Sequence, residues 1–180
     1  MIRTAASLIL VAGLSMGLAQ APKPAAKAAP PVRPAASAGP FDAQDPMSLI
    51  ALLATLDAQA TISGKAEDAV NLKVTTPAYA FGAQYAGCDA QGRKCKAVAF
   101  STLSATRTAT LAQLNGFNQS SITCRVWQDR QGKPHVMYSA LVQPQDSREA
   151  MRGHLGAWQG CLATFGDFLA DPNAYLASAP

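Results

Sequence analysis

The chain has 180 residues, of which 49% are hydrophobic and 14% are charged, and its formal net charge is +4. Four of its 15 lysines and arginines lie before residue 41, whereas all 11 aspartates and glutamates lie after it. The rest of the chain is therefore formally neutral. This argues against a nucleic-acid-binding domain, because such domains usually carry a basic excess.

Residues 1–19 have the features of a secretory signal peptide. Arg3 supplies a positive start, and the apolar run that follows is too short for a membrane span. Small residues allow cleavage after Ala19 or after Ala21, and Ala19 is preferred because the second cut would leave Pro22 at the new N-terminus. No cysteine lies nearby for lipid attachment. The sequence thus predicts a periplasmic or secreted protein that has no membrane span once the signal is removed.

Residues 20–40, QAPKPAAKAAPPVRPAASAGP, consist mostly of alanine and proline. Proline favours extended backbone and no side chain here is large enough to form a core, so we expect a disordered, semi-extended tether. Two interpretations of this tether remain open: a functional spacer, or a terminus without a role. One domain of ordinary size follows at residues 41–172, and residues 173–180 are expected to form a flexible tail.

A helix and then four strands are predicted for the first half of this domain. In DPMSLIALLATLD, Asp45 can cap a first turn that Pro46 suits, and leucines recur at helical spacing: Leu49, Leu52, Leu53 and Leu56. Apolar and polar residues then alternate in AQATISG, NLKVTT, AYAFGAQYAG and KAVAFS, with Ala60 and Ile62 on one side of the first segment. A period of two over consecutive segments indicates an antiparallel meander.

A shorter helix, two strands and a long helix follow. The segment TATLAQLNGFN would turn three residues inward: Leu111, Leu114 and Phe117. SITCRVWQ and HVMYSAL read as strands on either side of the polar turn DRQGKP, and one strand face is apolar: Ile122, Cys124 and Val126. In the last helix Asp146 and Glu149 have capping-box spacing, and Pro172 would close the helix. Its apolar stripe comprises Met151, Leu155, Trp158, Leu162, Phe165 and Leu169.

The order α-β-β-β-β-α-β-β-α describes an α+β fold, in which an antiparallel sheet of about five to six strands carries packed helices. Within it stand DPMSLIALL, FGAQYAGC, LNGFN, VWQDRQGKPHVMYS and a final helix from Trp158 to Phe165. In this order and spacing, from Asp45 to Leu169, they resemble the YbjN-like family of bacterial sensory transduction regulators. The chain departs from that pattern by carrying Phe117 where the family's N-x-W-N motif has tryptophan, and by its short, alanine-rich first strand.

The resemblance implies a fold similar to that of class I type III secretion chaperones, which bind extended client segments and often dimerise. Those chaperones are cytoplasmic and tend to be acidic, whereas this chain is predicted to be exported and neutral, so their secretion activity is not carried over. What the resemblance implies is a non-catalytic regulatory or binding module, with a homodimer as an option. It brings no catalytic residues and no cofactor.

All four cysteines lie in the predicted domain of an exported chain, which favours disulfides. Cys88 would end one strand and Cys95 begin the next, so a hairpin brings their Cα atoms to about 4.5–5.5 Å, within reach of a bond. The six-residue gap is wide for zinc, and a redox centre would prefer Cys-x-x-Cys at a helix start. Cys124 and Cys161 would also meet if the last helix packs on that strand. Two buried free thiols are the alternative, and four cysteines allow three pairings.

Thr123, Arg125 and Trp127 would lie on the face of their strand opposite Cys124. If helices cover only the Cys124 side, Trp127 is exposed beside Arg125, and both residue types are favoured anchors in protein interfaces. The competing interpretation is that Trp127 packs under a loop or on the neighbouring strand. The two histidines, His135 and His154, are expected at the surface or at its boundary.

The sequence contains no phosphate-binding glycine loop, metal cluster or nucleophile elbow. The first hypothesis is therefore an exported binding module that engages a protein partner through a sheet face or an edge strand. A periplasmic small-ligand sensor is the alternative, and an envelope enzyme is the least favoured. We accordingly expect no enzyme activity, no cofactor and no bound metal.

Overall fold

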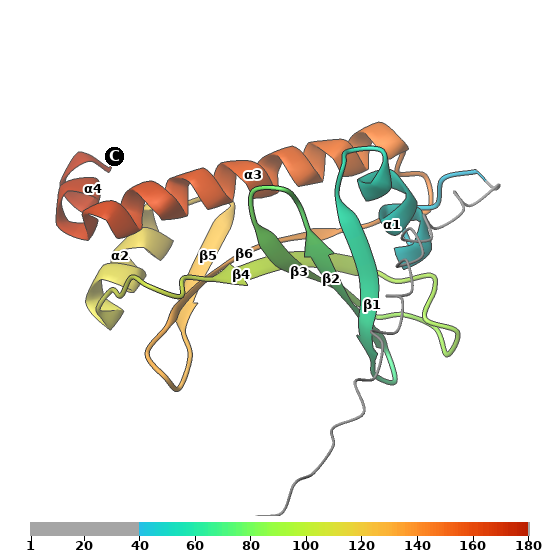
Figure 1. Ribbon diagram of the computed structural model, residues 1–180, viewed down its shortest axis with the longest axis horizontal. Coiled ribbons are helices and arrows are strands. Elements are labelled where there is room, and N and C mark those ends of the chain that lie inside the picture. Colours follow the sequence, from blue (N-terminus) through green and yellow to red (C-terminus); the bar gives the residue numbers. More distant parts are fainter. Residues whose placement is uncertain (1–39, 180) are drawn as a thin grey trace, which may run out of the picture. The chain divides into compact units, whose positions relative to one another are not determined.

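One antiparallel sheet organises the domain, and its helices lie along one face and at the ends (Figure 1). The computed structural model describes residues 40–179. The predicted signal peptide, its cleavage at Ala19 or Ala21, and all of the predicted tether except Pro40 lie outside these residues. The described elements are α1 (Pro46–Ala54), β1 (Gln59–Lys65), β2 (Ala69–Thr75), β3 (Ala80–Ala86), β4 (Ala97–Leu103), α2 (Leu111–Ser120), β5 (Cys124–Gln128), β6 (Pro134–Leu141), α3 (Arg148–Ala170) and α4 (Pro172–Ser178).

The six strands have the order β1-β2-β3-β4-β6-β5, and each neighbouring pair is antiparallel. The first four strands form a meander, and β6 rather than β5 then pairs with β4. The predicted α+β fold and its element order are confirmed, with one helix added at the C-terminal end. The likeness to secretion chaperones stays a prediction.

Side-chain caps begin the helices. The Asp45 carboxylate accepts a hydrogen bond from Met47 N at 2.8 Å before α1, and Thr110 and Gln113 form a reciprocal capping box at α2. The cap of α3 differs from the prediction. Ser147 caps this helix, while the Asp146 carboxylate accepts from Gln143 N in the preceding turn.

The core lies between α3 and the sheet. Trp158 of α3 is buried against the rings of Phe81 and Phe100, with ring centroids 5.7 and 6.3 Å apart. The buried strand residues alternate along the chain, as predicted: Ala60, Val70, Leu72, Val74, Phe81, Ala83, Tyr85, Val98, Phe100, Cys124, Val126, Pro134 and Val136. The buried stripe of α3 comprises Met151, Leu155, Trp158, Cys161, Phe165, Phe168 and Leu169.

Two hairpin loops are closed by the same local structure. In DAQGR (89–93) and DRQGK (129–133), the aspartate carboxylate accepts from backbone N–H groups two and four residues later. Gly92 and Gly132 have φ angles of 76° and 78°, which residues other than glycine rarely adopt. This combination is the three-residue hairpin loop in which a type I turn is followed by a left-handed glycine.

Residues 173–180 were expected to be a flexible tail, and this expectation is wrong for most of the segment. Pro172 does not close the long helix but opens α4, whose N–H groups at Asn173 and Ala174 donate to the Asp171 carboxylate. The ring of Tyr175 packs on Phe117 and Phe168, with centroids 5.8 and 5.6 Å away. The apolar contacts of α4 with α2 and α3 therefore order the end of the chain.

Four apolar residues expected to be buried are exposed, because the elements end or bend near them. Leu56 lies beyond the end of α1, and Leu111 stands at the solvent side of the first turn of α2. Ile62 pairs with the buried Leu72, but it lies on the edge strand β1 next to a register shift and is 42% exposed. Ile122 precedes β5, which begins only at Cys124, and is 92% exposed.

Candidate functional site

Both predicted cysteine pairs are disulfides in the structure. Cys88 and Cys95 lie just beyond the facing ends of β3 and β4, with Cα atoms 3.8 Å apart. Cys124 of β5 is bonded to Cys161 of α3, with Cα atoms 5.6 Å apart. All four cysteines are therefore bonded in pairs. Two disulfides fit an oxidising compartment outside the cytoplasm.

No described helix covers the sheet face turned away from α3 (Figure 1). The strand register sets one row of residues directly across five strands of this face: Lys73, Gly82, Ser101, Met137 and Arg125. A second row contains Leu103, His135 and Trp127. We call these two rows the open face. Small residues occupy the middle of the first row, at Gly82 and Ser101, and larger side chains stand at Lys73 of β2, at Leu103 of β4 and along β5 and β6.

Trp127 is the large aromatic residue of the open face, and it is 40% exposed. Its ring stacks on His135 of β6, with centroids 4.9 Å apart and an interplanar angle of 18°. Each of the two competing predictions for Trp127 is therefore met in part. The ring packs on the neighbouring strand through one face, and the remaining surface is open to solvent.

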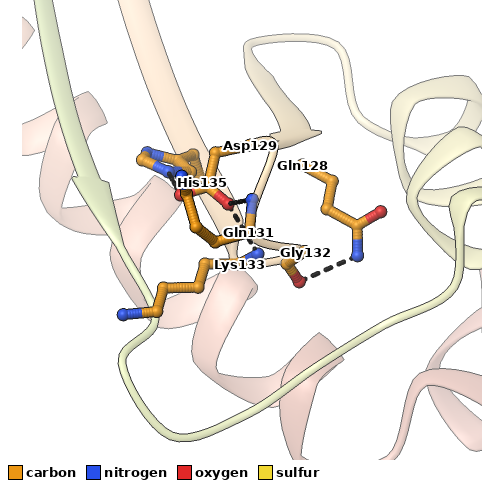
Figure 2. A network of polar contacts seen from close by, with 6 residues as sticks. All are labelled: Gln128, Asp129, Gln131, Gly132, Lys133 and His135. Carbon is orange, nitrogen blue, oxygen red and sulfur yellow. Dashed lines mark hydrogen bonds and ion pairs between the residues drawn. The ribbon is translucent and has the colours of Figure 1, made fainter.

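His135 is held in turn by the loop that precedes it (Figure 2). Its Nε2 atom lies 3.1 Å from Oδ2 of Asp129, and the other carboxylate oxygen of Asp129 accepts from the N–H groups of Gln131 and Lys133. The hydrogen bond from His135 and then those from the backbone lower the pKa of Asp129 below its ordinary value. A rigid turn thus fixes the imidazole on which Trp127 stacks, which sets the orientation of the indole.

Arg125 and Thr123, predicted to accompany Trp127, are both exposed, but their polar groups are used locally. The guanidinium of Arg125 donates to the carbonyl oxygens of Ser121 and Cys124 at 2.8 and 2.7 Å. Thr123 Oγ1 lies 3.5 Å from Cys124 Sγ. All three predicted interface residues are thus exposed, and Arg125 keeps its positive charge at the surface while one of its guanidinium nitrogens binds these carbonyl oxygens.

The outer edge of the sheet at β5 is closed by side chains. The Asn118 amide at the end of α2 donates to Val126 O at 2.9 Å and accepts from Val126 N at 2.8 Å, as a neighbouring strand would. Ser121 Oγ accepts from Cys124 N at 3.1 Å. At the opposite edge, the bulge in β1 interrupts the regular strand. Asn118 is the last residue of the LNGFN motif, but the sequence alone did not indicate that its amide would bind the backbone of Val126.

The second histidine contributes to helix packing. His154 of α3 lies within hydrogen-bond distance of Tyr138 of β6, with Nδ1 and the phenol oxygen 2.8 Å apart. Burial raises the pKa of Tyr138. Both histidines are half-buried, at the boundary that the sequence predicted. The partner of His135 is Asp129 and that of His154 is Tyr138, and neither hydrogen bond reaches a serine, threonine or cysteine.

Two further buried polar groups stand without a partner. Burial, followed by the charges of Asp45 and Asp42, raises the pKa of the Tyr85 phenol. Neither Tyr85 Oη nor Trp158 Nε1 has a hydrogen-bond partner.

Within residues 40–179, no group of three or more histidine, cysteine, aspartate or glutamate side chains is arranged to hold a metal ion. No helix in this range is long and apolar enough to cross a membrane.

No protein-family model, curated protein or solved structure matches this chain. The likeness to YbjN-like regulators therefore rests on the sequence motifs, and the function has to be argued from the surface described above.

Proposed function

We propose that this protein is an exported, non-catalytic binding module that engages a protein partner through the open face, with Trp127 as its anchor. The observation that carries the proposal is an exposed indole, held in place by His135, on a sheet face that no described element covers. Tryptophan is enriched among the residues that dominate binding energy, and a fixed ring loses little conformational entropy on binding.

The sheet edges support the face rather than an edge as the docking surface. A partner strand that joins β5 would have to displace Asn118 from Val126, and at β1 it would meet the bulge. The edge-strand variant of the original hypothesis is therefore the weaker one.

The charge of the sheet indicates what kind of protein segment would bind. None of the six strands contains aspartate or glutamate, whereas Lys73 and Arg125 stand at the two ends of one row of the open face. Four strand spacings separate these two residues, which is about 19 Å. A partner with acidic side chains at its periphery and an apolar contact for Trp127 would complement this surface.

The proposed location rests on the predicted signal peptide and the disulfides, and the proposed regulatory role rests on the sequence motifs. The predicted signal peptide, residues 1–19, would export the chain, and the two disulfides fit the compartment that export reaches. A regulatory role in the bacterial envelope, as in the YbjN-like proteins that the motifs resemble, is part of this proposal.

Crosslinking in the native envelope, followed by purification of the tagged protein and mass spectrometry, tests the proposal. A photoreactive residue at Ser101, in the middle of the open face, is expected to capture one dominant protein. Trp127→Ala should abolish capture and lower the melting temperature by only a few degrees, because the indole is partly exposed.

Leu111→Ala is the matched control. Leu111 is a large apolar residue of α2 that is 69% exposed and does not belong to the open face, so its removal should leave capture unchanged. Equal capture by wild type and Trp127→Ala would refute the proposal. A loss of folding in Trp127→Ala would instead place the indole in the core.

A further inference from the structure

Four large apolar side chains gather along β6 on the side of the sheet turned away from α3. Leu103 and Trp127 flank His135 on the two neighbouring strands, and Met137 follows on β6 itself. Leu141 ends β6 and points to the same side as Met137, because residues four apart in a strand share a face. Leu103, Trp127 and Leu141 are 44, 40 and 71% exposed, respectively. We call Leu103, Trp127, Met137 and Leu141 the β6 patch.

The β6 patch has the length and width of one helix. From His135, which lies between Leu103 and Trp127, to Leu141 the strand rises by about 20 Å. An α-helix spans that distance with about 13 residues, which is close to four turns. Across the strands, Leu103 and Trp127 are two strand spacings apart, about 10 Å, and a helix with its side chains is about 10–12 Å wide.

The face of a sheet offers side chains but no backbone groups to an incoming segment, since the strands use their N–H and C=O groups on one another. An extended segment on this face would leave its own backbone groups unpaired where the apolar side chains exclude water, which is costly. A helix satisfies its backbone internally. The opposite face of the same sheet is covered in this way by α3 (Figure 1).

The charges beside the β6 patch indicate what should flank the apolar stripe of such a helix. Arg125 lies one strand from β6 on one side, and Lys73 lies three strands from it on the other. Neither cation forms an ion pair with another residue of the range 40–179. The nearby carboxylate of Asp129 is held by His135 and by backbone N–H groups. Acidic side chains on both sides of the docked helix would therefore meet unpaired positive charges.

We propose that the partner segment on the open face is an amphipathic α-helix of about four turns, which lies along β6 with acidic residues on both sides of its apolar stripe. This inference rests on the proposed function, since it specifies the partner segment for the same surface. A second copy of this chain does not supply such a helix from residues 40–179. Among the described helices only α3 contains charged residues, and its apolar stripe is buried.

A designed peptide, titrated into the purified protein with both disulfides intact, tests the inference. The probe has about 14 residues, with leucines at helical spacing, glutamates on both flanks and a covalent staple that fixes the helix. Isothermal titration calorimetry should give a dissociation constant below about 1 mM. The backbone amide NMR signals of Ser101, Met137 and Leu141 should shift on binding. No binding at about 1 mM, or shifts confined to other parts of the domain, would overturn the inference.

Two matched peptides test the helix and the charges separately. One has the same composition and staple in a scrambled order, so that it has no apolar stripe, and the other carries lysine in place of every glutamate. Both should bind at least about tenfold more weakly than the probe. Equal affinity of the scrambled peptide would exclude recognition of an amphipathic helix, and equal affinity of the lysine peptide would exclude the role of the acidic flanks.

Variants of the protein locate the contact. Leu141→Ala should raise the dissociation constant of the probe about fivefold, because it removes the far end of the β6 patch. Leu111→Ala removes a leucine of similar exposure on α2 and should leave the affinity unchanged. Lys73→Glu should weaken binding of the probe and strengthen binding of the lysine peptide. The control is Lys65→Glu on β1, which should change neither because Lys65 pairs with the buried Val70 and so lies on the other side of the sheet.

Capture in the native envelope separates failure of this inference from failure of the proposed function. Capture from Ser101 should fall in Leu141→Ala as well as in Trp127→Ala. If it depends on Trp127 but not on Leu141, the partner docks without a helix along β6, and the inference alone is overturned. If Ser101 captures no protein, the proposed function falls and the inference falls with it.

Discussion

The two disulfides should differ in their contribution to stability, and the difference follows from the loops that they close. The Cys88–Cys95 bond spans a sequence separation of 7 residues, and the Cys124–Cys161 bond spans 37. If a disulfide acts by restricting the unfolded chain, these separations correspond to about 2.4 and about 3.8 kcal/mol, respectively, at 25 °C. Since small domains are stable by about 5–15 kcal/mol, the longer crosslink is a large part of the total.

Two double variants isolate the bonds: Cys88→Ala with Cys95→Ala, and Cys124→Ala with Cys161→Ala. Urea unfolding at fixed temperature gives the free energy of unfolding and its slope for each variant and for wild type. The second variant should lose about 1.4 kcal/mol more than the first. Loss of buried sulfur atoms adds to both values, because Cys95, Cys124 and Cys161 are all buried.

Equal losses, or a larger loss from the short loop, would refute the reasoning from chain entropy. They would show that native packing around the sulfurs, and not the restriction of the unfolded chain, sets the contribution of each bond. Maleimide labelling of the unfolded, unreduced wild type should find no free thiol. If four thiols reacted, neither disulfide would exist, and the reasoning about loop lengths would have no basis.

Two further substitutions test the local structures around β5. Asn118→Ala should lower the free energy of unfolding by about 2 kcal/mol, because it removes two hydrogen bonds to Val126. The control is Asn115→Ala, which is one turn away and exposed and should lower it hardly at all. Urea titration measures both. His135→Ala should raise the pKa of Asp129 toward its ordinary value, measured by NMR titration of the carboxyl carbon. Because the folded pKa of Asp129 is lowered, its stabilising effect is present above the unfolded pKa and disappears as the pH falls through the folded one. An unchanged pKa in His135→Ala would show that the backbone N–H groups alone hold the carboxylate.

Local patterns in the sequence predicted much of the architecture. Alternation of apolar and polar residues located the strands, and the stripe around Trp158 located the long helix, because both periods follow from backbone geometry. The repeated DxQG(K/R) segments also encode their hairpin loops locally, through an aspartate and a left-handed glycine. The tail was mispredicted because proline ends one helix and begins another equally well, and only contacts with Phe117 decide between them.

The candidate surface divides in the same way. Parity along β5 placed Trp127 opposite Cys124 from the sequence alone, since neighbouring residues of a strand point to opposite faces. That His135 would stack on the indole, that Arg125 would turn to nearby carbonyl groups, and that Asn118 would occupy the edge depended on which strands and helices became neighbours. Sequence periodicity determines the face on which a residue lies, but its contacts come from elements far away in the chain, and only the packed tertiary structure brings these together.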